Sequence, residues 1–167
     1  IMAFSKIIAE SMDLTDTYNF TGTLQQNGAS IGETNKPMFK VSGGNLSLAH
    51  NTHTKLTISS EAIDTDNCFD LGSNNRFTPN KAGKYLFILQ VQAPTGTDAD
   101  YVNPYITKNG SSHIGCAGVQ RDYNSVQFTR IAEANGSGDY FEAYAEQESG
   151  GNLNLQVNEF SAFFIGT

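Results

Sequence analysis

Two glutamates, Glu142 and Glu146, stand four positions apart in the stretch 139–147, and a pair of carboxylates is the usual machinery for cleaving a glycosidic bond. Tyr140 and Tyr144 accompany them, and an aromatic ring beside a carboxylate suits a sugar-binding surface as well as a subunit interface. Residues spaced by even numbers share one face of a β-strand. We therefore interpret the glutamates as exposed charges on a half-buried strand, and we favour an interface for the two tyrosines.

Metal binding is the second function that the residue types suggest. His50 and His53 stand three apart in a polar loop, while His113 stands alone. The weak candidates for calcium are two Asp-x-Asp pairs: Asp64, Asp66, Asp98 and Asp100. Calcium takes six to eight oxygen ligands, so one pair is insufficient. We predict solvated turns and no metal or other cofactor, but calcium between two loops, or an ion on a symmetry axis near His50, stays an alternative.

Catalytic signatures are missing from the sequence. It contains no nucleophile elbow, no His-Glu-x-x-His pair and no phosphate-binding glycine loop. We predict that the protein is not an enzyme, with a polysaccharide depolymerase using Glu142 as the enzymatic alternative. Cys68 and Cys116 are interpreted as two reduced, partly buried residues, although a disulfide between them stays open.

Composition narrows the class of partner. The formal net charge of the 167 residues is -7, which argues against nucleic acid and anionic membrane surfaces, because both attract basic proteins. No apolar run is long enough to span a membrane. Residues 2–10 lack the apolar core and cleavage site of an export signal. The abundance of glycine, 16 residues, is typical of a turn-rich β protein.

A central strand at 85–92 positions the other elements. It follows a turn at 79–83 that contains proline, asparagine and glycine. Apolar residues occupy both of its faces: Tyr85, Phe87, Leu89 and Val91 on one, and Leu86 and Ile88 on the other. A strand that is apolar on both faces is buried on both. One face can pack in the domain core, and the other needs a second cover, for which a partner subunit is the natural candidate.

Further short strands surround this one. They are expected at 38–41, 46–48, 54–58, 101–108, 112–116, 125–132, 139–147 and 159–166. Asn109-Gly110 is a strong hairpin signal between two of them. The pentapeptide Ser-Gly-Gly-Asn-Leu occurs at 42–46 and again at 149–153, and we interpret both copies as turns. Eight to ten such strands indicate a sandwich or a jelly roll.

Several motifs resemble the C1q/tumour-necrosis-factor superfamily. They are Phe69-Asp70, Arg76-Phe77-Thr78-Pro79, the run 82–87 (Ala-Gly-Lys-Tyr-Leu-Phe), Lys108-Asn109-Gly110 and the closing run 160–166 (Phe-Ser-Ala-Phe-Phe-Ile-Gly). The resemblance covers about 37–167. It departs at Phe141-Glu142-Ala143, where many members carry Leu-x-x-Gly-Asp-x-Val.

The resemblance implies a fold and an assembly. The expected fold class is all-β, a ten-stranded jelly-roll sandwich (C1q/TNF-like) that forms a homotrimer, with a short extended N-terminal segment. We predict that Tyr85 or Phe87 faces the three-fold axis. The predicted trimer interface comprises seven aromatic residues: Tyr85, Phe87, Tyr140, Tyr144, Phe160, Phe163 and Phe164.

Residues 1–36 are expected to form an attachment or trimerisation segment, and residues 37–167 the jelly-roll domain. A segment this short cannot bury its own apolar residues, so it is either disordered or wraps on partner chains, and we favour the second. The predicted attachment residues are Phe4, Ile7, Ile8, Tyr18 and Phe20. The segment is similar to the stretches that precede fibre-tip domains in virion proteins of tailed phages, in particular marine phages.

These resemblances imply a non-enzymatic component of a tailed-phage virion, as fibre tip or head decoration. Its expected partners are two further copies of itself, other virion proteins and a host-surface glycan or protein, with no nucleic acid and no membrane insertion. Its expected location is the virion, assembled in the host cytoplasm. The alternative is a secreted complement-like or cytokine-like trimer that binds a ligand.

Overall fold

Alternating apolar and polar residues fold this chain into β-strands. The computed structural model describes residues 25–26, 29–30, 35–93, 101–116, 119–120 and 125–167, and none of these residues is helical. The chain divides into two units, Ile1–Thr34 and Asn35–Thr167. In the first unit, β1 (Gln25–Gln26) pairs antiparallel with β2 (Ala29–Ser30). The predicted attachment residues, Phe4, Ile7, Ile8, Tyr18 and Phe20, lie outside the described residues.

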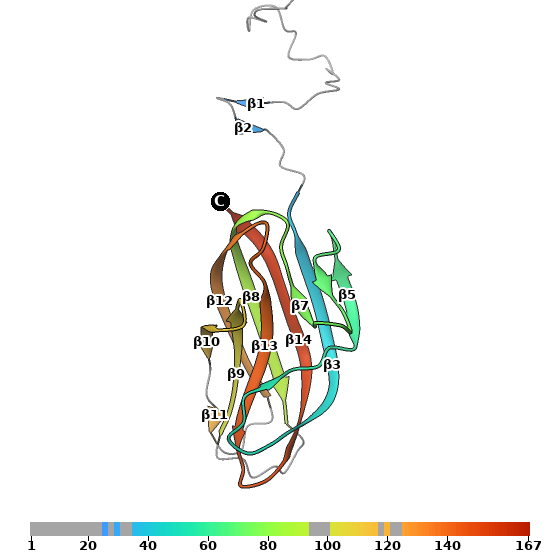
Figure 1. The fold of residues 1–167 in the computed structure, drawn as a ribbon, viewed down its shortest axis with the longest axis vertical. Coiled ribbons are helices and arrows are strands. Elements are labelled where there is room, and N and C mark those ends of the chain that lie inside the picture. The colour runs from blue at the N-terminus through green and yellow to red at the C-terminus, as the bar shows by residue number, and fades with distance from the viewer. Residues whose placement is uncertain (1–24, 27–28, 31–34, 94–100, 117–118, 121–124) are drawn as a thin grey trace, which may run out of the picture. The chain divides into compact units, whose positions relative to one another are not determined.

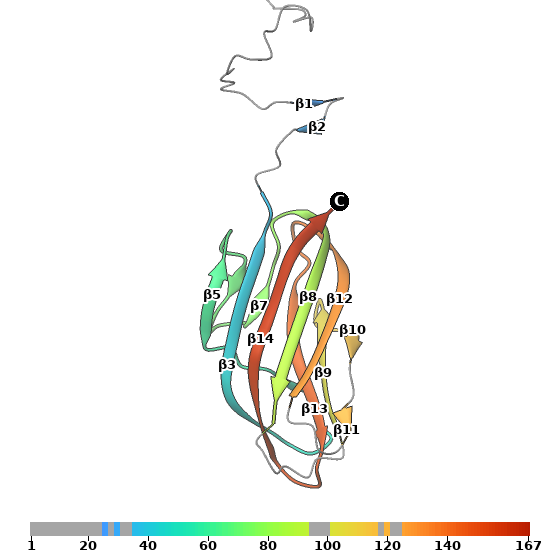
Figure 2. The ribbon, with the colours of Figure 1, turned by 180° about the vertical axis from the view of Figure 1, so that it is seen from behind.

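The second unit contains two antiparallel sheets. The five-stranded sheet has the order β12-β8-β14-β3-β5. Its strands are β3 (Met38–Leu48), β5 (Ser60–Asp64), β8 (Ala82–Gln92), β12 (Ser125–Asn135) and β14 (Leu153–Gly166). Figure 2 brings β3, β14, β8 and β12 to the front, with the long β14 between β3 and β8.

The seven-stranded sheet lies on the other side of the unit, where Figure 1 shows β9, β13 and β10 in front. It follows the order β10-β9-β13-β7-β6, with β11 on β9 and β4 on β13. Its strands are β4 (Thr54–Lys55), β6 (Phe69–Asp70), β7 (Arg76–Phe77), β9 (Tyr101–Lys108), β10 (Ser112–Cys116), β11 (Val119–Gln120) and β13 (Phe141–Glu148). The predicted strands 101–108 and 112–116 are confirmed with these bounds. The positive φ angles of Asn109 and Gly110 explain the turn between them.

Aromatic rings from both sheets meet in the core. Phe39 packs against Phe77 with 4.5 Å between ring centroids, and Phe87 against Phe141 with 4.6 Å. Within the core cluster, the rings that are almost fully buried are Tyr85, Phe39, Phe77, Phe87, Phe141 and Phe160. Ring pairs offset or tilted at these distances are favourable beyond the apolar area that they bury. The rings therefore hold the two sheets face to face.

The two Ser-Gly-Gly-Asn-Leu pentapeptides have different structures. The copy at 149–153 forms a turn before β14, with Gly150 at φ 77°. The copy at 42–46 lies inside β3, where its pairing with β14 shifts register at Gly43 and Asn45. The expected turn at 42–46 is therefore wrong, because the long β14 offers that copy a continuous partner and the extra residue is taken up as a bulge.

Candidate functional site

The outward side of the five-stranded sheet, which we call the five-strand face, carries an apolar row across four strands. In the strand register, Ile131 of β12 is opposite Leu86 of β8, Leu86 is opposite Phe163 of β14, and Phe163 is opposite Met38 of β3. Ile131 is 58% exposed and Phe163 is 36% exposed. Directly opposed side chains on one face lie about 5 Å apart and make a continuous surface. The row is thus an apolar stripe open to solvent.

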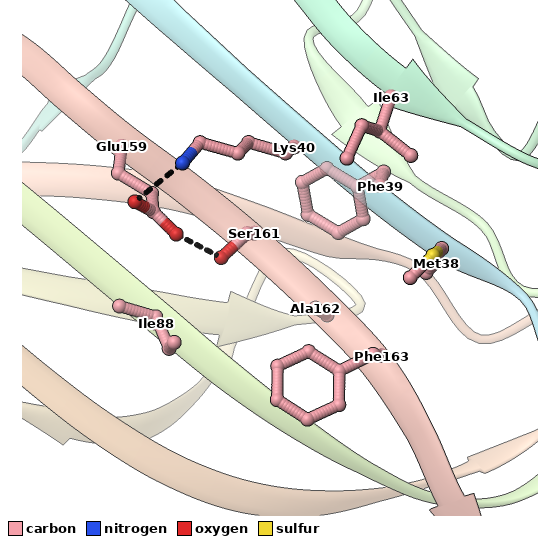
Figure 3. A pocket seen from close by; sticks show the side chains of 9 residues that line it. All are labelled: Met38, Phe39, Lys40, Ile63, Ile88, Glu159, Ser161, Ala162 and Phe163. Atoms are coloured by element: carbon pink, nitrogen blue, oxygen red, sulfur yellow. Dashed lines mark hydrogen bonds and ion pairs between the residues drawn. The ribbon is translucent and has the colours of Figure 1, made fainter.

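A second row runs beside the first and contains a hollow. Thr129, Ile88, Ser161, Lys40 and Ile63 are opposite one another in sequence across β12, β8, β14, β3 and β5. Because the Ser161 side chain is small, a hollow of about 160 Å³ opens above it (Figure 3). Its lining residues are Met38, Phe39, Lys40, Ile63, Ile88, Glu159, Ser161, Ala162 and Phe163. Figure 3 shows the Phe163 ring, Ile88 and Ile63 around it.

One polar group interrupts the apolar lining of the hollow. Lys40 Nζ lies 3.1 Å from Glu159 Oε2, and the Ser161 hydroxyl donates a hydrogen bond of 2.7 Å to Glu159 Oε1. The hydrogen bond from Ser161, together with the neighbouring Lys40, lowers the pKa of Glu159 despite its partial burial. Both charged groups already have partners, so a surface that covers them would not leave an isolated charge.

The prediction for the trimer interface is wrong for three of its seven residues. Tyr85, Phe87 and Phe160 are each 0% exposed, and the Tyr85 hydroxyl donates to the Lys81 carbonyl oxygen at 2.8 Å. Their rings fill the protomer's own core and leave no surface for a partner. The neighbours Leu86 and Ile88 point outward instead, because successive side chains of a strand alternate between faces.

The other four residues lie in three different places. Phe163 lies in the apolar row. Phe164 is half-buried, packs its ring 5.5 Å from that of Tyr85, and carries Lys81 Nζ 3.9 Å above it. Tyr140 and Tyr144 are half-buried; Tyr144 belongs to the seven-stranded sheet, and Tyr140 directly precedes β13 of that sheet. Their place in an interface stays a prediction.

Tyr144 belongs to a stack of rings on the outward side of the seven-stranded sheet. Tyr105 lies between it and His113, with centroid distances of 5.6 Å and 4.5 Å. The Tyr105 hydroxyl is 2.7 Å from His53 Nδ1, and that nitrogen is 3.7 Å from Glu146 Oε2. Burial, followed by the charge of Glu146, raises the pKa of Tyr105 to about 12.

Glu142 does not have the environment expected for it. The sequence predicted an exposed charge, but Glu142 is 7% exposed and its Oε1 is 2.5 Å from Lys55 Nζ. Lys55 on β4 and Glu142 on β13 lie on the same side of the sheet, where β4 pairs with β13 at Tyr144. The expectation of an exposed charge is therefore wrong, because a neighbouring strand covers Glu142.

The residues that the sequence suggested as metal ligands make contacts with other groups of the protein. His50 Nδ1 accepts the Gly150 amide at 3.2 Å, whereas His53 contacts Tyr105. The two oxygens of Asp64 accept the amides of Cys68 and Phe69, both at 2.9 Å, and so shape the loop before β6. Asp66 accepts the Thr65 hydroxyl at 3.3 Å. Asp98 and Asp100 lie outside the described residues. Among the residues that the structure describes, no three His, Cys, Asp or Glu side chains form a group suited to a metal ion.

Cys68 is a free, buried thiol, and burial raises its pKa. The side chain of Cys116 lies outside the described part of the chain. In the described ranges, no helix is long and apolar enough to cross a membrane.

Sequence reasoning missed most of the five-strand face. It expected one face of the central strand to need a second cover but assigned Tyr85 or Phe87 to the three-fold axis, whereas the structure puts Leu86 and Ile88 on this outward face. It did not find Met38, Ile63 or Ile131, because each belongs to a different strand and only the sheet order brings them onto one face. The sequence signal that was available for this face is that residues 85–92 are apolar on both sides of the strand.

Solved structures resemble this fold, although the sequence matches no protein-family model and no curated protein. PRD1 vertex protein P5 is 16% identical over 78% of this chain and 97% of its own, with a TM-score of 0.62. Murine APRIL at pH 8.5 is 12% identical over 77% and 98%, with a TM-score of 0.57. The globular domain of zebrafish complement 1qA protein is 15% identical over 77% and 97%, with a TM-score of 0.50. The chain thus has a C1q/TNF-like jelly-roll fold, as the sequence predicted.

Proposed function

We propose that this protein is a non-enzymatic structural and binding component of a tailed-phage virion, where it works as a homotrimer at a fibre tip or as a head decoration. The observation that carries the proposal is the apolar row Ile131, Leu86, Phe163 and Met38 on the five-strand face. Soluble monomers rarely expose a contiguous apolar surface, and such a surface marks an interaction site. Further copies of the same chain are the partners that we propose for it.

The likeness to PRD1 vertex protein P5 supports a place on a virion. A trimer that covers its five-strand faces leaves the outward side of the seven-stranded sheet exposed, so we propose that side and the adjoining loops for contact with a host-surface glycan or protein. Residues 1–36 are proposed as the segment that joins the domain to other virion proteins. Neither role requires catalysis.

A secreted complement-like or cytokine-like trimer is the second candidate function. The likenesses to murine APRIL and to the globular domain of zebrafish complement 1qA protein favour it. Secreted proteins use disulfides, whereas proteins assembled in a reducing cytoplasm rarely do. A disulfide between Cys68 and Cys116 in native material, found by mass spectrometry under non-reducing conditions, would support this second candidate.

A particle that lacks this chain tests the virion role. We expect the chain to be found in purified virions by mass spectrometry, and we expect virions assembled without it to adsorb more slowly to host cells or to lose their contents at a lower temperature. Restoring the gene in trans should restore both properties. Absence of the chain from purified particles, or unchanged adsorption and unchanged particle stability together, would exclude the proposal.

A further inference from the structure

The chain's three histidines gather at one place in the fold. His50 and His53 belong to residues 49–53, which join β3 to β4 and which we call the histidine loop. His113 of β10 lies 6.0 Å from His53, measured between ring centroids. All three residues are exposed. Histidine is the side chain that ordinarily gains charge as the pH falls from 8 to 5. The response of the chain to such a fall in pH is therefore concentrated here.

The first histidine of the loop holds a neighbouring turn by accepting a hydrogen bond. His50 Nδ1 accepts the Gly150 amide at 3.2 Å. A backbone amide can only donate, so Nδ1 carries no proton in this contact. The contacts that the structure gives to His50 are with Thr52, Gln147 and Gly150, none of which titrates. A proton on Nδ1 would bring two donors face to face, so proton uptake by His50 breaks this contact.

The second histidine of the loop lies between two possible partners. His53 Nδ1 is 2.7 Å from the Tyr105 hydroxyl and 3.7 Å from Glu146 Oε2. As a neutral ring, His53 accepts the hydroxyl proton of Tyr105 through Nδ1. As a cation it must donate from that atom, and a carboxylate is the stronger acceptor because a hydrogen bond between two charged groups is about twice as strong as a neutral one. Proton uptake therefore moves His53 from Tyr105 to Glu146.

The remaining charges around the histidine loop do not offset this proton uptake. His113 faces His53 from β10, and two imidazolium cations at 6.0 Å repel each other. Lys55, two residues after the loop on β4, is already paired with Glu142. Among the described residues, Glu146 is the carboxylate that contacts His53. A fall in pH thus adds more positive charge here than this one carboxylate balances.

Two backbone hydrogen bonds fasten the loop and the residues after it to β13. The Asn51 amide donates to the Gln147 carbonyl oxygen, and the Leu56 amide donates to the Ala143 carbonyl oxygen, both at 2.9 Å. Asn51 has a φ of 51°, which is uncommon for a residue with a side chain. A segment in such a conformation depends on the contacts around it, and it opens locally when those contacts are lost. The amides of Asn51 and Leu56 therefore report whether the loop is closed.

We infer that the histidine loop is an acid-sensitive latch beside the outward side of the seven-stranded sheet. Proton uptake by His50 and His53 releases the loop from the turn at 149–152 and from Tyr105. The inference rests on the proposed function, because this side and its adjoining loops are the surface proposed for contact with a host. It adds a regulation to that surface, which has one shape and charge at neutral pH and another at mildly acidic pH.

Amide hydrogen exchange on the purified full chain tests the latch. Exchange is measured at pH 7.5 and pH 5.0, and each rate is divided by the intrinsic rate at that pH. We expect the protection of the Asn51 and Leu56 amides to fall about tenfold at pH 5.0, because the side-chain contacts that close the loop are lost. The amides of β8 in the core should keep their protection. Equal protection of Asn51 and Leu56 at the two pH values would refute the latch.

Asparagine in place of histidine separates the hydrogen bonds from the titration. The amide oxygen of asparagine accepts hydrogen bonds from about the place of Nδ1 but gains no proton in this pH range. The double variant His50→Asn, His53→Asn should therefore keep the loop protected at both pH values. His113→Asn is the matched control and should retain most of the pH-dependent loss, because both contacts of the loop remain. A double variant that still loses its protection at pH 5.0 would show that other groups cause the opening.

The outcomes separate this inference from the proposed function. If the loop opens at pH 5.0 but the chain is absent from purified virions, the proposed function fails and the latch stands. If the chain is present in virions and the loop stays protected at pH 5.0, the latch alone fails. Thermal unfolding at pH 7.5 shows whether each variant is folded. Should the double variant lack an unfolding transition, the two single variants replace it, and each should lose less protection at pH 5.0 than the unaltered chain.

Discussion

Tyr105 shows how a single residue can face outward on a strand and still be buried. It is 2% exposed because His113 and Tyr144 cover the two sides of its ring. Its pKa of about 12 in the folded protein exceeds the value of 10.0 expected when the chain is unfolded. A raised pKa favours folding while both states are protonated, and this advantage is lost as pH rises from 10 to 12, where only the unfolded state ionises.

We expect the free energy of unfolding to fall by about 2–3 kcal/mol over that interval on account of Tyr105. Tyr105→Phe should be about 1 kcal/mol less stable at pH 7, because it loses the hydrogen bond to His53, and its stability should fall less steeply above pH 10. Urea unfolding at pH 7, 9, 10 and 11 measures both effects. Parallel pH profiles for the two proteins above pH 10 would contradict this account.

At the scale of the element, local residue chemistry predicted the long strands but missed short ones such as β5, and it did not predict which face of a strand is inside. The hairpin of β9 and β10 follows from Asn109-Gly110, whose positive φ angles any such turn requires. Which side chains of β8 point into the core could not be derived in this way. Tyr85 and Leu86 are both apolar, and a shift of one residue exchanges the two faces. In β8, Tyr85 and Phe87 fill the space between the sheets together with Leu89 and Val91, and Leu86 and Ile88 are left outside.

The pentapeptide in β3 contains two glycines with different surroundings. A side chain added at Gly43 would collide with the carbonyl oxygen of Thr57, whereas nothing lies within 4 Å of a side chain added at Gly44. We expect Gly43→Ala to destabilise the protein by about 1–3 kcal/mol, because β3 must move away from the segment beside it. Gly44→Ala is the control and should change stability by less than about 1 kcal/mol. Thermal unfolding compares them, and equal losses of stability for the two variants would contradict this account.

At the scale of the whole molecule, the motifs at 69–87 and 160–166 predicted the jelly roll, because they encode the aromatic core that joins the two sheets. Residues such as Phe77 and Phe160 carry those motifs and are fully buried. The candidate site could not be predicted in the same way. Ile131, Ile88 and Ile63 are separated by long stretches of sequence, and each is an ordinary apolar residue until the strand order puts them on one face.

The assembly of several chains also belongs to this scale, and a shortened chain tests which of the two units carries the contacts between protomers. Every residue of the apolar row and of the hollow lies in the unit Asn35–Thr167. That unit also has its own buried core. We therefore expect a chain that begins at Asn35 to keep the oligomeric mass of the full chain, measured by light scattering at equal molar concentration. If the shortened chain is a monomer while the full chain is a trimer, residues 1–34 hold the protomers together, and the five-strand face needs a different partner.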